Sequence, residues 1–327
     1  MQFDENKRGF EWKEEEGMRE KNRLQRFLKK LCKYRMYLLM LSPAVIYTLV
    51  FSYYPMAGVV MAFKKYNYQG GIWGSPWNGF NNFKFFFQSG QAWTVTRNTV
   101  LYNIAFIIVG TVAQMAVGIF LTEIHSRRFR KVSQSMMFLP YFISWVIVGV
   151  MAFNIFSSDY GFLNRLLVAL GGEPYPFYTQ PKVWPAILIF FNIWKGIGYG
   201  SVMYLAAIMG VDTSVYEAAA VDGANVFQRI WRVTIPAIMP TTVILFLMSI
   251  GRIFKGNFDM FYNLVGTNGL LFQYTDVIDI LAFRALITSN DFGMSSAIGL
   301  FQSVLCFITV MVANKLVSMY DKDYSLF

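Results

Sequence analysis

Long apolar segments alternate with short polar stretches along the chain. Six of them hold the roughly 20 mainly apolar residues that a helix needs to cross a bilayer. The predicted spans cover residues 36–54, 100–121, 137–156, 184–208, 238–261 and 294–317. The polar sequence GRIFKG interrupts the fifth span and places Arg252 and Lys255 inside it. Continuous runs of this length exclude a β-barrel and predict an all-α membrane protein with six transmembrane helices.

The basic residues are concentrated on one side of these predicted spans. Residues 21–35, directly before the first span, contain seven basic residues and no acidic one. With an even number of spans, the same side holds the basic loop 127–131, the loop with Arg229 and Arg232, and the tail with Lys315 and Lys322. The positive-inside rule therefore places both termini in the cytoplasm. We expect a basic segment at 1–35, attracted by anionic lipid, followed by a six-helix domain at 36–327.

Composition agrees with this class and excludes several kinds of chemistry. The chain is 55% hydrophobic and 15% charged, whereas soluble domains are roughly 45–50% apolar and about 25% charged. The single histidine, His125, and two distant cysteines exclude a histidine-based triad and a cysteine or histidine metal centre. The basic N-terminal stretch abuts a membrane span, so it does not indicate nucleic-acid binding. No phosphate-binding G-x-x-x-x-G-K-[ST] motif is present, so any ATP must be bound by another chain. We therefore expect no enzyme, no catalytic residue and no cofactor in this chain.

The loop 213–240, between the fourth and fifth predicted spans, is too polar to cross a membrane. Ser214 and Glu217 fit the S-x-x-E capping box, which predicts a short helix beginning at Ser214. Alanines continue this helix, and Asp222-Gly223 ends it with a turn. Two interpretations follow from these residues. Glu217 caps its own helix and the alanines pack locally, or the small alanine face enters a groove of a partner protein.

The same loop contains a pattern of residues that is known from a family. A second short amphipathic stretch is predicted at 226–233, and two prolines then mark the return to the membrane. The pattern E-A-A-x-x-D-G-A, followed after a gap by isoleucine and proline, resembles the "EAA" loop of binding-protein-dependent ABC importer permeases. It is formed here by Glu217, Ala218, Ala219, Asp222, Gly223 and Ala224, then Ile235, Pro236 and Pro240. Further segments resemble permeases for oligosaccharides and polysaccharide fragments, namely 53–67, 139–149, 204–208, 275–286 and 298–307.

The resemblance covers residues 36–327 and implies a MetI-like permease fold in a bacterial inner or plasma membrane. It implies a heterodimer with a second, homologous permease subunit that is a different chain. It also implies two ATPase subunits that bind ATP and Mg²⁺, and an extracytoplasmic solute-binding protein. In such importers the loop docks into a groove of the ATPase, whose closure drives the permeases between inward-open and outward-open states. The implied docking surface consists of Tyr216, Glu217, Ala218, Ala219, Asp222, Gly223 and Ala224.

Polar and ionisable side chains within the spans are candidates for the substrate pathway, because such groups are costly in a membrane. Aromatic faces and amides suit the apolar faces and hydroxyls of sugars. The candidates are Asn192, Trp194, Lys195, Tyr199, Arg252, Lys255, Asn257 and Asp259. Alternatively, Trp194 packs between helices, and the basic groups reach the interface or pair with Asp259 or with a partner subunit. A pathway lined by Arg252 and Lys255 would favour acidic oligosaccharides.

Other functions fit the residues less well. An ion-coupled secondary transporter would need acidic groups in the spans, where they are almost absent, and it leaves the 213–240 loop unexplained. A membrane-embedded enzyme would need paired carboxylates or more than one histidine. An importer of the same class for a non-sugar solute shares the loop, and only the resemblance of the other segments to sugar permeases argues against it.

Overall fold

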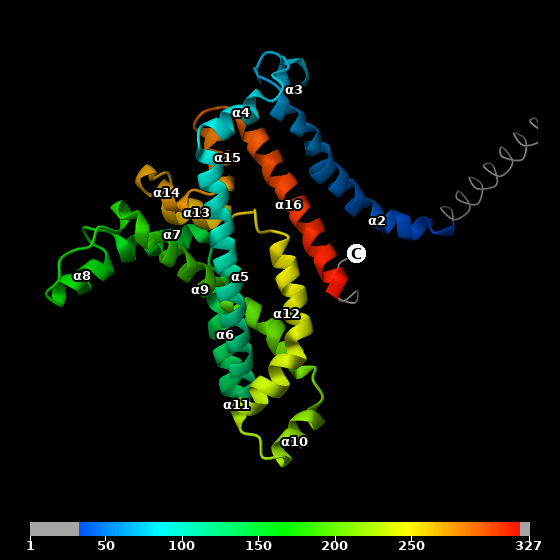
Figure 1. Ribbon diagram of the computed structural model, residues 1–327, viewed down its shortest axis with the longest axis vertical. Coiled ribbons are helices and arrows are strands. Elements are labelled where there is room, and N and C mark those ends of the chain that lie inside the picture. Colours follow the sequence, from blue (N-terminus) through cyan, green and yellow to red (C-terminus); the bar gives the residue numbers. More distant parts are fainter. Residues whose placement is uncertain (1–32, 321–327) are drawn as a thin grey trace, which may run out of the picture. The chain divides into compact units, whose positions relative to one another are not determined.

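The computed structural model describes residues 33–320 (Figure 1). Most of the predicted basic N-terminal segment and the tail with Lys322 lie outside the described residues. Within residues 33–320 the chain is helical, with no named strand and a single isolated bridge between Lys64 and Trp77. The prediction of an all-α protein is confirmed.

The chain divides into two units, of which the first ends at Val59. Its helical path consists of α2 (Arg35–Thr48) and a π-helical turn, η1 (Leu49–Tyr53), and continues as the 3₁₀ helix η2 (Tyr54–Phe63). Together these elements form one apolar segment, Arg35–Phe63, long enough to cross a membrane. The first predicted span is confirmed.

The second unit, Val60–Phe327, contains the remaining elements. Four long helical segments dominate it, and short helices join them. The long elements are α5 (Gln91–Glu123), α9 (Trp184–Met209), α12 (Ile235–Ile250) and α16 (Phe292–Tyr320). The others are α3 (Gly71–Gly74), α4 (Asn81–Gln88), α6 (Arg127–Phe142), α7 (Trp145–Phe156), α8 (Phe162–Ala169), η3 (Phe177–Thr179), η4 (Pro181–Val183), α10 (Thr213–Val221), α11 (Val226–Arg229), η5 (Ile230–Thr234), α13 (Phe258–Val265), η6 (Gly269–Leu271), α14 (Phe272–Thr275) and α15 (Ile278–Ile287).

The second, fourth and sixth predicted spans are confirmed, because each lies almost entirely within one long helix, α5, α9 or α16. The third is not one straight helix. The axes of α6 and α7 differ by 94°, and residues 143–144 separate the two helices. Ser144 caps α7, since its side chain accepts a hydrogen bond from the Ile147 N–H. With this bent pair counted as one span, the described residues contain six.

The fifth predicted span has the wrong bounds at both ends. Its helical segment begins at Val226 and stops at Ile250, and α13 starts only at Phe258. Pro236 and Pro240 therefore do not precede the helix but lie inside the continuous helical segment Val226–Ile250. The π-helical turn η5, in which the Ile235 N–H bonds to the Ile230 carbonyl, precedes Pro236. Such a turn accommodates a residue that cannot donate a backbone hydrogen bond.

Glycines allow the helices of the second unit to approach closely. A Cβ on Gly118 of α5 would lie 2.8 Å from Tyr204 Cβ of α9. A Cβ on Gly198 of α9 would overlap the Met137 carbonyl of α6, and one on Gly149 of α7 would overlap the Asn263 carbonyl of α13. Packing of small residues is a main source of helix association in membranes, where lipid offers no hydrophobic drive.

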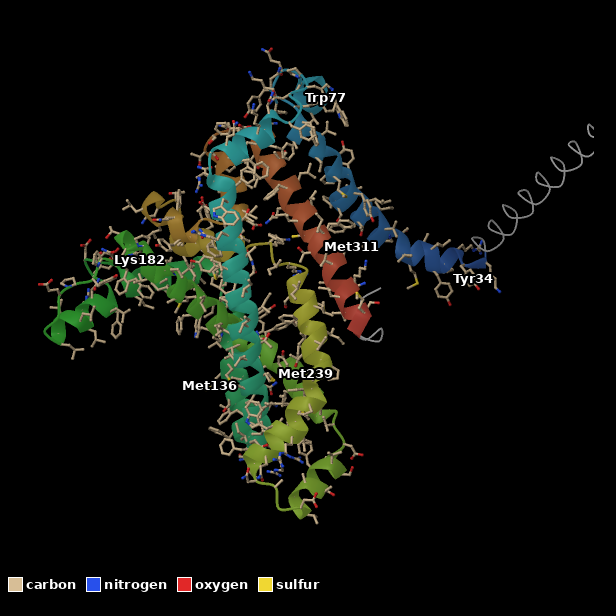
Figure 2. All side chains as sticks on the ribbon, viewed as in Figure 1. Tyr34, Trp77, Met136, Lys182, Met239 and Met311 are labelled. Carbon is tan, nitrogen blue, oxygen red and sulfur yellow. The ribbon has the colours of Figure 1, made fainter. Side chains whose placement is uncertain are left out.

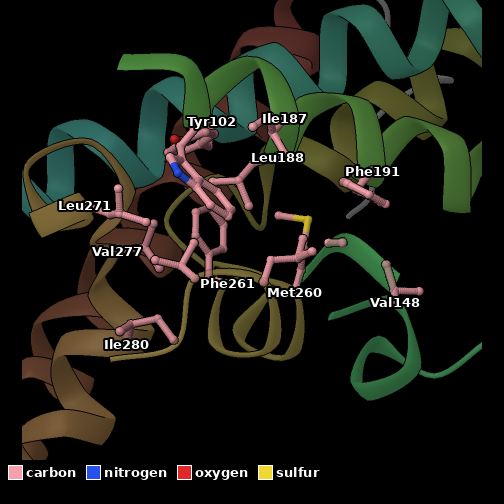
Figure 3. Packing of buried hydrophobic residues seen from close by; sticks show 14 residues of the cluster. Tyr102, Val148, Ile187, Leu188, Phe191, Met260, Phe261, Leu271, Val277 and Ile280 are labelled. Carbon is pink, nitrogen blue, oxygen red and sulfur yellow. The ribbon is translucent and has the colours of Figure 1, made fainter. Parts of the chain in front are cut away.

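The largest buried cluster joins α5, α7, α9 and α13 (Figure 3). Tyr102 of α5 packs edge-on against Phe261 of α13 at 5.0 Å between ring centroids, and its hydroxyl donates to the Tyr274 carbonyl at 2.9 Å. A second cluster joins α4, α5, α15 and α16, and a third joins α5, α9 and α12. These clusters hold the helices around the functional regions described next.

Many large apolar side chains remain exposed on the helices. Met136 is 71% exposed, and Met239 and Met311 are each 46% exposed and project from their helices (Figure 2). Exposed apolar area on this scale is typical of a surface that lipid or a partner subunit covers.

Candidate functional site

The α10 helix of the predicted docking loop begins one residue earlier than expected. Asp212, not Ser214, is its N-cap, and the Asp212 carboxylate accepts a hydrogen bond from the Ser214 N–H at 2.9 Å. This bond lowers the pKa of the Asp212 carboxyl. The predicted capping box of Ser214 and Glu217 is therefore wrong, because an acidic side chain just before it occupies the cap position. The local sequence does contain a capping box, but it lies on α11, where Asn225 and Gln228 bond reciprocally.

The predicted turn after α10 is confirmed. Gly223 has a φ of 76°, in the left-handed region that disfavours residues with a side chain. The Gly223 N–H bonds to the Ala220 carbonyl at 3.1 Å, and the Ala224 N–H bonds to the Ala219 carbonyl at 3.0 Å. This pair of bonds is the Schellman motif. It reverses the chain between α10 and α11.

Two side-chain contacts fasten this loop to the long helices. The Tyr216 hydroxyl donates to Thr234 Oγ1 at 3.2 Å, and Arg229 lies 4.0 Å from the Glu123 carboxylate at the end of α5. Tyr216 is therefore half-buried against the following helix. The other predicted docking residues divide by exposure: Glu217, Ala218, Asp222 and Gly223 are exposed, and Ala219 and Ala224 are half-buried.

Large apolar side chains lie beside this predicted surface and were not among the predicted residues. Val221 is 87% exposed, Phe227 75% and Trp231 70%. A cavity of about 330 Å³ opens between the end of α10 and the start of the next helix, and both Arg229 and Arg232 line it. In the sequence, Val221, Phe227 and Trp231 resemble residues on the apolar face of an amphipathic stretch. The hydropathy pattern therefore did not show whether their side chains are packed or exposed.

A second region is a central cavity of about 560 Å³ among α5, α9, α12, α13 and α15. It brings together five of the predicted pathway residues, namely Asn192, Arg252, Lys255, Asn257 and Asp259. It also brings in residues that the sequence did not single out, including Asn103, Thr111, Gln114, Ser249 and Asp279. The cavity is thus lined largely by amides, hydroxyls and charged groups.

Residues 251–257, where the fifth span is broken, form one wall of the central cavity. Asp279 of α15 accepts hydrogen bonds from the Gly256 N–H at 2.6 Å and from Gln302 Nε2 at 2.9 Å. Gln302 also donates to the Phe254 carbonyl at 2.8 Å, and Asn103 donates to the Lys255 carbonyl at 3.2 Å. Irregular backbone at membrane depth is tolerated where protein groups or a water-filled cavity satisfy it. These side chains satisfy it here.

The charges around the central cavity are mixed. Arg252, Lys255 and Asp259 are exposed, whereas Asp279 is engaged with the wall segment. Asn257 has a structural task, because its side chain caps α13 by accepting from the Met260 N–H at 3.2 Å. The arrangement offers both donors and acceptors to a polar solute, with two exposed cations on the wall. No group of three histidine, cysteine, aspartate or glutamate residues within the described part of the chain is placed to hold a metal ion.

Three predicted pathway residues of α9 lie away from the central cavity. Trp194 packs against the largest buried cluster. Tyr199 is exposed and stacks on Tyr141 of α6 at 4.7 Å between ring centroids. Lys195 donates to the carbonyls of Pro140 (3.2 Å), Tyr141 (2.7 Å) and Ile143.

Lys195 thus satisfies the backbone at the bend between α6 and α7. Its ammonium also lies 5.4 Å from the centre of the Trp145 ring. Three carbonyls use all three N–H donors of the ammonium. The distribution of charges along the sequence did not reveal this contact, because the carbonyls come from residues far from Lys195 in the chain.

Replacement of Lys195 by methionine is expected to destabilise the bend by about 2 kcal/mol, because three backbone carbonyls lose a charged donor. The midpoint of thermal unfolding in mild detergent should fall by several degrees. Lys182→Met, at an exposed lysine before α9 (Figure 2), is the control and should leave the midpoint unchanged. Equal midpoints for both variants would contradict the role of Lys195 in the bend.

Residues 114–318 match the family described as "Binding-protein-dependent transport system inner membrane component". Protein LplB of Bacillus subtilis is 34% identical over 285 residues, which cover 87% of this chain and 89% of that protein. The polygalacturonan/rhamnogalacturonan transport system permease protein YteP of the same organism is 32% identical, over 93% of this chain and 94% of that protein.

A bacterial ABC transporter involved in the import of the acidic polysaccharide alginate shares the fold. One of its chains superposes with a TM-score of 0.81 and 32% sequence identity, over 89% of this chain and 98% of that chain. A second structure of an alginate transporter contains an alginate pentasaccharide-bound periplasmic protein and matches equally well, with a TM-score of 0.81.

Proposed function

The chain belongs to the family of binding-protein-dependent transport system inner membrane components, and on this premise we propose that it forms half of the pathway of an ATP-driven oligosaccharide importer. The central cavity carries the proposal. Its amides, hydroxyls and two exposed cations suit the hydroxyls and carboxylates of a sugar chain. Broken helices commonly form the substrate sites of transporters, and residues 251–257 are such a break.

The proposed substrate class is the acidic oligosaccharides. Arg252 and Lys255 are exposed on the cavity wall, whereas the Asp279 carboxylate is engaged by Gly256 and Gln302. The similarity to an importer of an acidic polysaccharide supports this choice. Asp259 also lines the cavity, so its exposed lining carries two cations and one carboxylate.

The proposed assembly contains a second permease subunit, two ATPase subunits that bind ATP and Mg²⁺, and an extracytoplasmic solute-binding protein. The α10 end of the bundle would then face the cytoplasm, with both termini on that side. The exposed face of α10 would dock on the ATPase through Glu217, Ala218 and Asp222. The exposed Phe227 and Trp231 would extend this contact.

The attachment of α10 suggests how movement of the ATPase would reach the pathway. The Tyr216–Thr234 hydrogen bond ties α10 to the helical segment Val226–Ile250. That segment ends where the wall of the central cavity begins, at Gly251. A displacement of α10 would therefore act on the wall through one continuous helix, which is a rigid-body form of coupling.

The proposed substrate class is tested with the complete transporter reconstituted in vesicles. Replacement of both Arg252 and Lys255 by glutamine is expected to lower uptake of acidic oligosaccharides about tenfold, because a charge-assisted hydrogen bond contributes about 1.5–3 kcal/mol. Uptake of neutral oligosaccharides of equal length should change by less than about twofold. The control replaces the exposed Lys84 and Arg165, which lie outside the central cavity, by glutamine.

Equal losses for acidic and neutral sugars would reject the acidic substrate class. Uptake of neither sugar by the unaltered transporter would reject the oligosaccharide proposal as a whole and favour another solute. Transport that persists after ATP depletion, with the ion gradient held constant, would favour an ion-coupled carrier.

A further inference from the structure

A third cavity, of about 350 Å³, lies apart from the central cavity, between α5, the start of α9 and α14. Leu101, Pro185 and Ile189 form an apolar part of its lining, and Arg97 and Gln273 supply polar groups. None of its lining residues is acidic. It shares no lining residue with the central cavity, so it has no part in the proposed substrate pathway.

The charge of Arg97 is not neutralised within this cavity. Its Nε and Nη2 atoms donate to the side-chain oxygen of Asn98, at 3.4 and 3.1 Å. The Asn98 amide is neutral, and its own NH₂ group is committed to the carbonyls of Gln273 and Asp276. The guanidinium is exposed and retains N–H donors for an anionic group.

An exposed apolar stripe continues from the cavity along α5. Leu101 is 57% exposed, Ile104 39%, Ile108 55% and Val112 58%. These residues follow Arg97 at spacings of four, three, four and four, so they share one face of the helix. From Arg97 to Val112 the face is about 22 Å long, which exceeds the roughly 15 Å of one hydrocarbon leaflet. The opposite face of α5, with Val95, Thr99 and Tyr102, is buried.

Arg97 lies where a membrane interface is expected. Trp93, one turn earlier on α5, is 73% exposed. Tryptophan is enriched at the level of the lipid headgroups, and an arginine at that level is suited to bidentate hydrogen bonds with a lipid phosphate. The order along α5 is therefore an interfacial tryptophan, an uncompensated cation at an open cavity, and an apolar track longer than a leaflet.

We propose that this cavity binds an anionic phospholipid. The phosphate would lie against the Arg97 guanidinium, with Gln273 as a further polar group for the headgroup. One acyl chain would pass over Leu101 and follow Ile104, Ile108 and Val112 along α5. The commitment to lipid rests on charge complementarity and on the continuity of the cavity with the apolar track. A polar solute would match the cation but not the track.

The test counts lipids bound to the assembled transporter by native mass spectrometry in mild detergent. The delipidated complex is mixed with either phosphatidylglycerol or phosphatidylcholine. The two lipids have similar acyl chains and differ in net charge. The unaltered transporter should retain phosphatidylglycerol preferentially. Arg97→Gln should reduce that preference about tenfold. Arg97→Lys should keep most of it, and Lys182→Gln, at an exposed lysine outside this cavity, should not change it.

Leu101→Asn tests the apolar track separately and should lower retention of both lipids. An unchanged preference in Arg97→Gln would overturn the proposal. A second result would also overturn it, namely that the Arg97→Gln and Leu101→Asn variants lose the second permease subunit while their lipid retention is unchanged. This face of α5 would then be a protein interface. If Arg97→Gln does not assemble, equal phosphatidylglycerol retention by Leu101→Asn and the unaltered transporter would also overturn it.

Discussion

Replacement of Gly198 by leucine is expected to abolish accumulation of the folded transporter. A side chain at this position of α9 would overlap the Met137 carbonyl and crowd the Phe138 amide of α6. Both are backbone atoms within a helix, so they cannot move aside as a flexible side chain would. The expected cost is about 3 kcal/mol or more, a large part of the 5–15 kcal/mol that typically stabilises a domain. The measurement is the yield of monodisperse protein in mild detergent.

Gly196→Leu is the matched control for this prediction. Gly196 lies two residues away on α9, and a Cβ there would meet nothing within 4 Å. Both variants add the same side chain to the same helix and remove one helix-weakening glycine. Normal yield of Gly198→Leu, or equal losses for both variants, would show that close approach of α6 and α9 does not hold the unit together.

Replacement of Gly223 by valine is expected to uncouple the transporter from its ATPase while leaving the long helices intact. The positive φ of Gly223 closes the Schellman motif that turns the chain from α10 into α11. A side chain costs about 1–2 kcal/mol in this conformation, and a β-branched one is the least suited to it. Co-purification of the proposed ATPase and ATP-dependent uptake should both fall about tenfold.

Gly223→Asn provides the control, because asparagine tolerates the left-handed conformation. No heavy atom lies within 4 Å of a Cβ at this position, so the two variants differ in backbone preference and not in local clashes. Asparagine should retain most of the ATPase binding and uptake. Full ATPase binding by Gly223→Val would contradict the role of this turn. Absence of any ATPase from the unaltered complex would contradict the proposed assembly itself.

The bend in the third span shows where prediction from the sequence failed. Residues 137–156 are mainly apolar, and hydropathy cannot distinguish a straight helix from two helices at 94°. At the bend, the Lys195 ammonium donates hydrogen bonds to carbonyls at the end of α6. Lys195 was a pathway candidate because an ionisable group in a span is costly. The structure places it against the backbone of another helix.

The broken fifth span was more accessible to prediction. GRIFKG combines glycines with charged residues, and this local signal marked the site of the break. The signal did not reveal what holds the broken segment. Asp279 and Gln302 do so from α15 and α16, and in the sequence they are one acid and one amide among many.

Helix content, most of the spans and the turn at Gly223 follow from properties of neighbouring residues, namely apolar runs of sufficient length and a glycine after a run of helix formers. The family could be recognised for the same reason, because its loop motif is contiguous. The three cavities, the position of Lys195 and the N-cap at Asp212 required coordinates. The cap is a local feature, for which Asp212 and Ser214 were both suitable. The other features depend on contacts between residues up to about half the chain apart, as between Asn98 and Asp276. Such contacts arise from helix packing. The helices approach closely at Gly118 and Gly198, and no periodicity in the sequence specifies these positions.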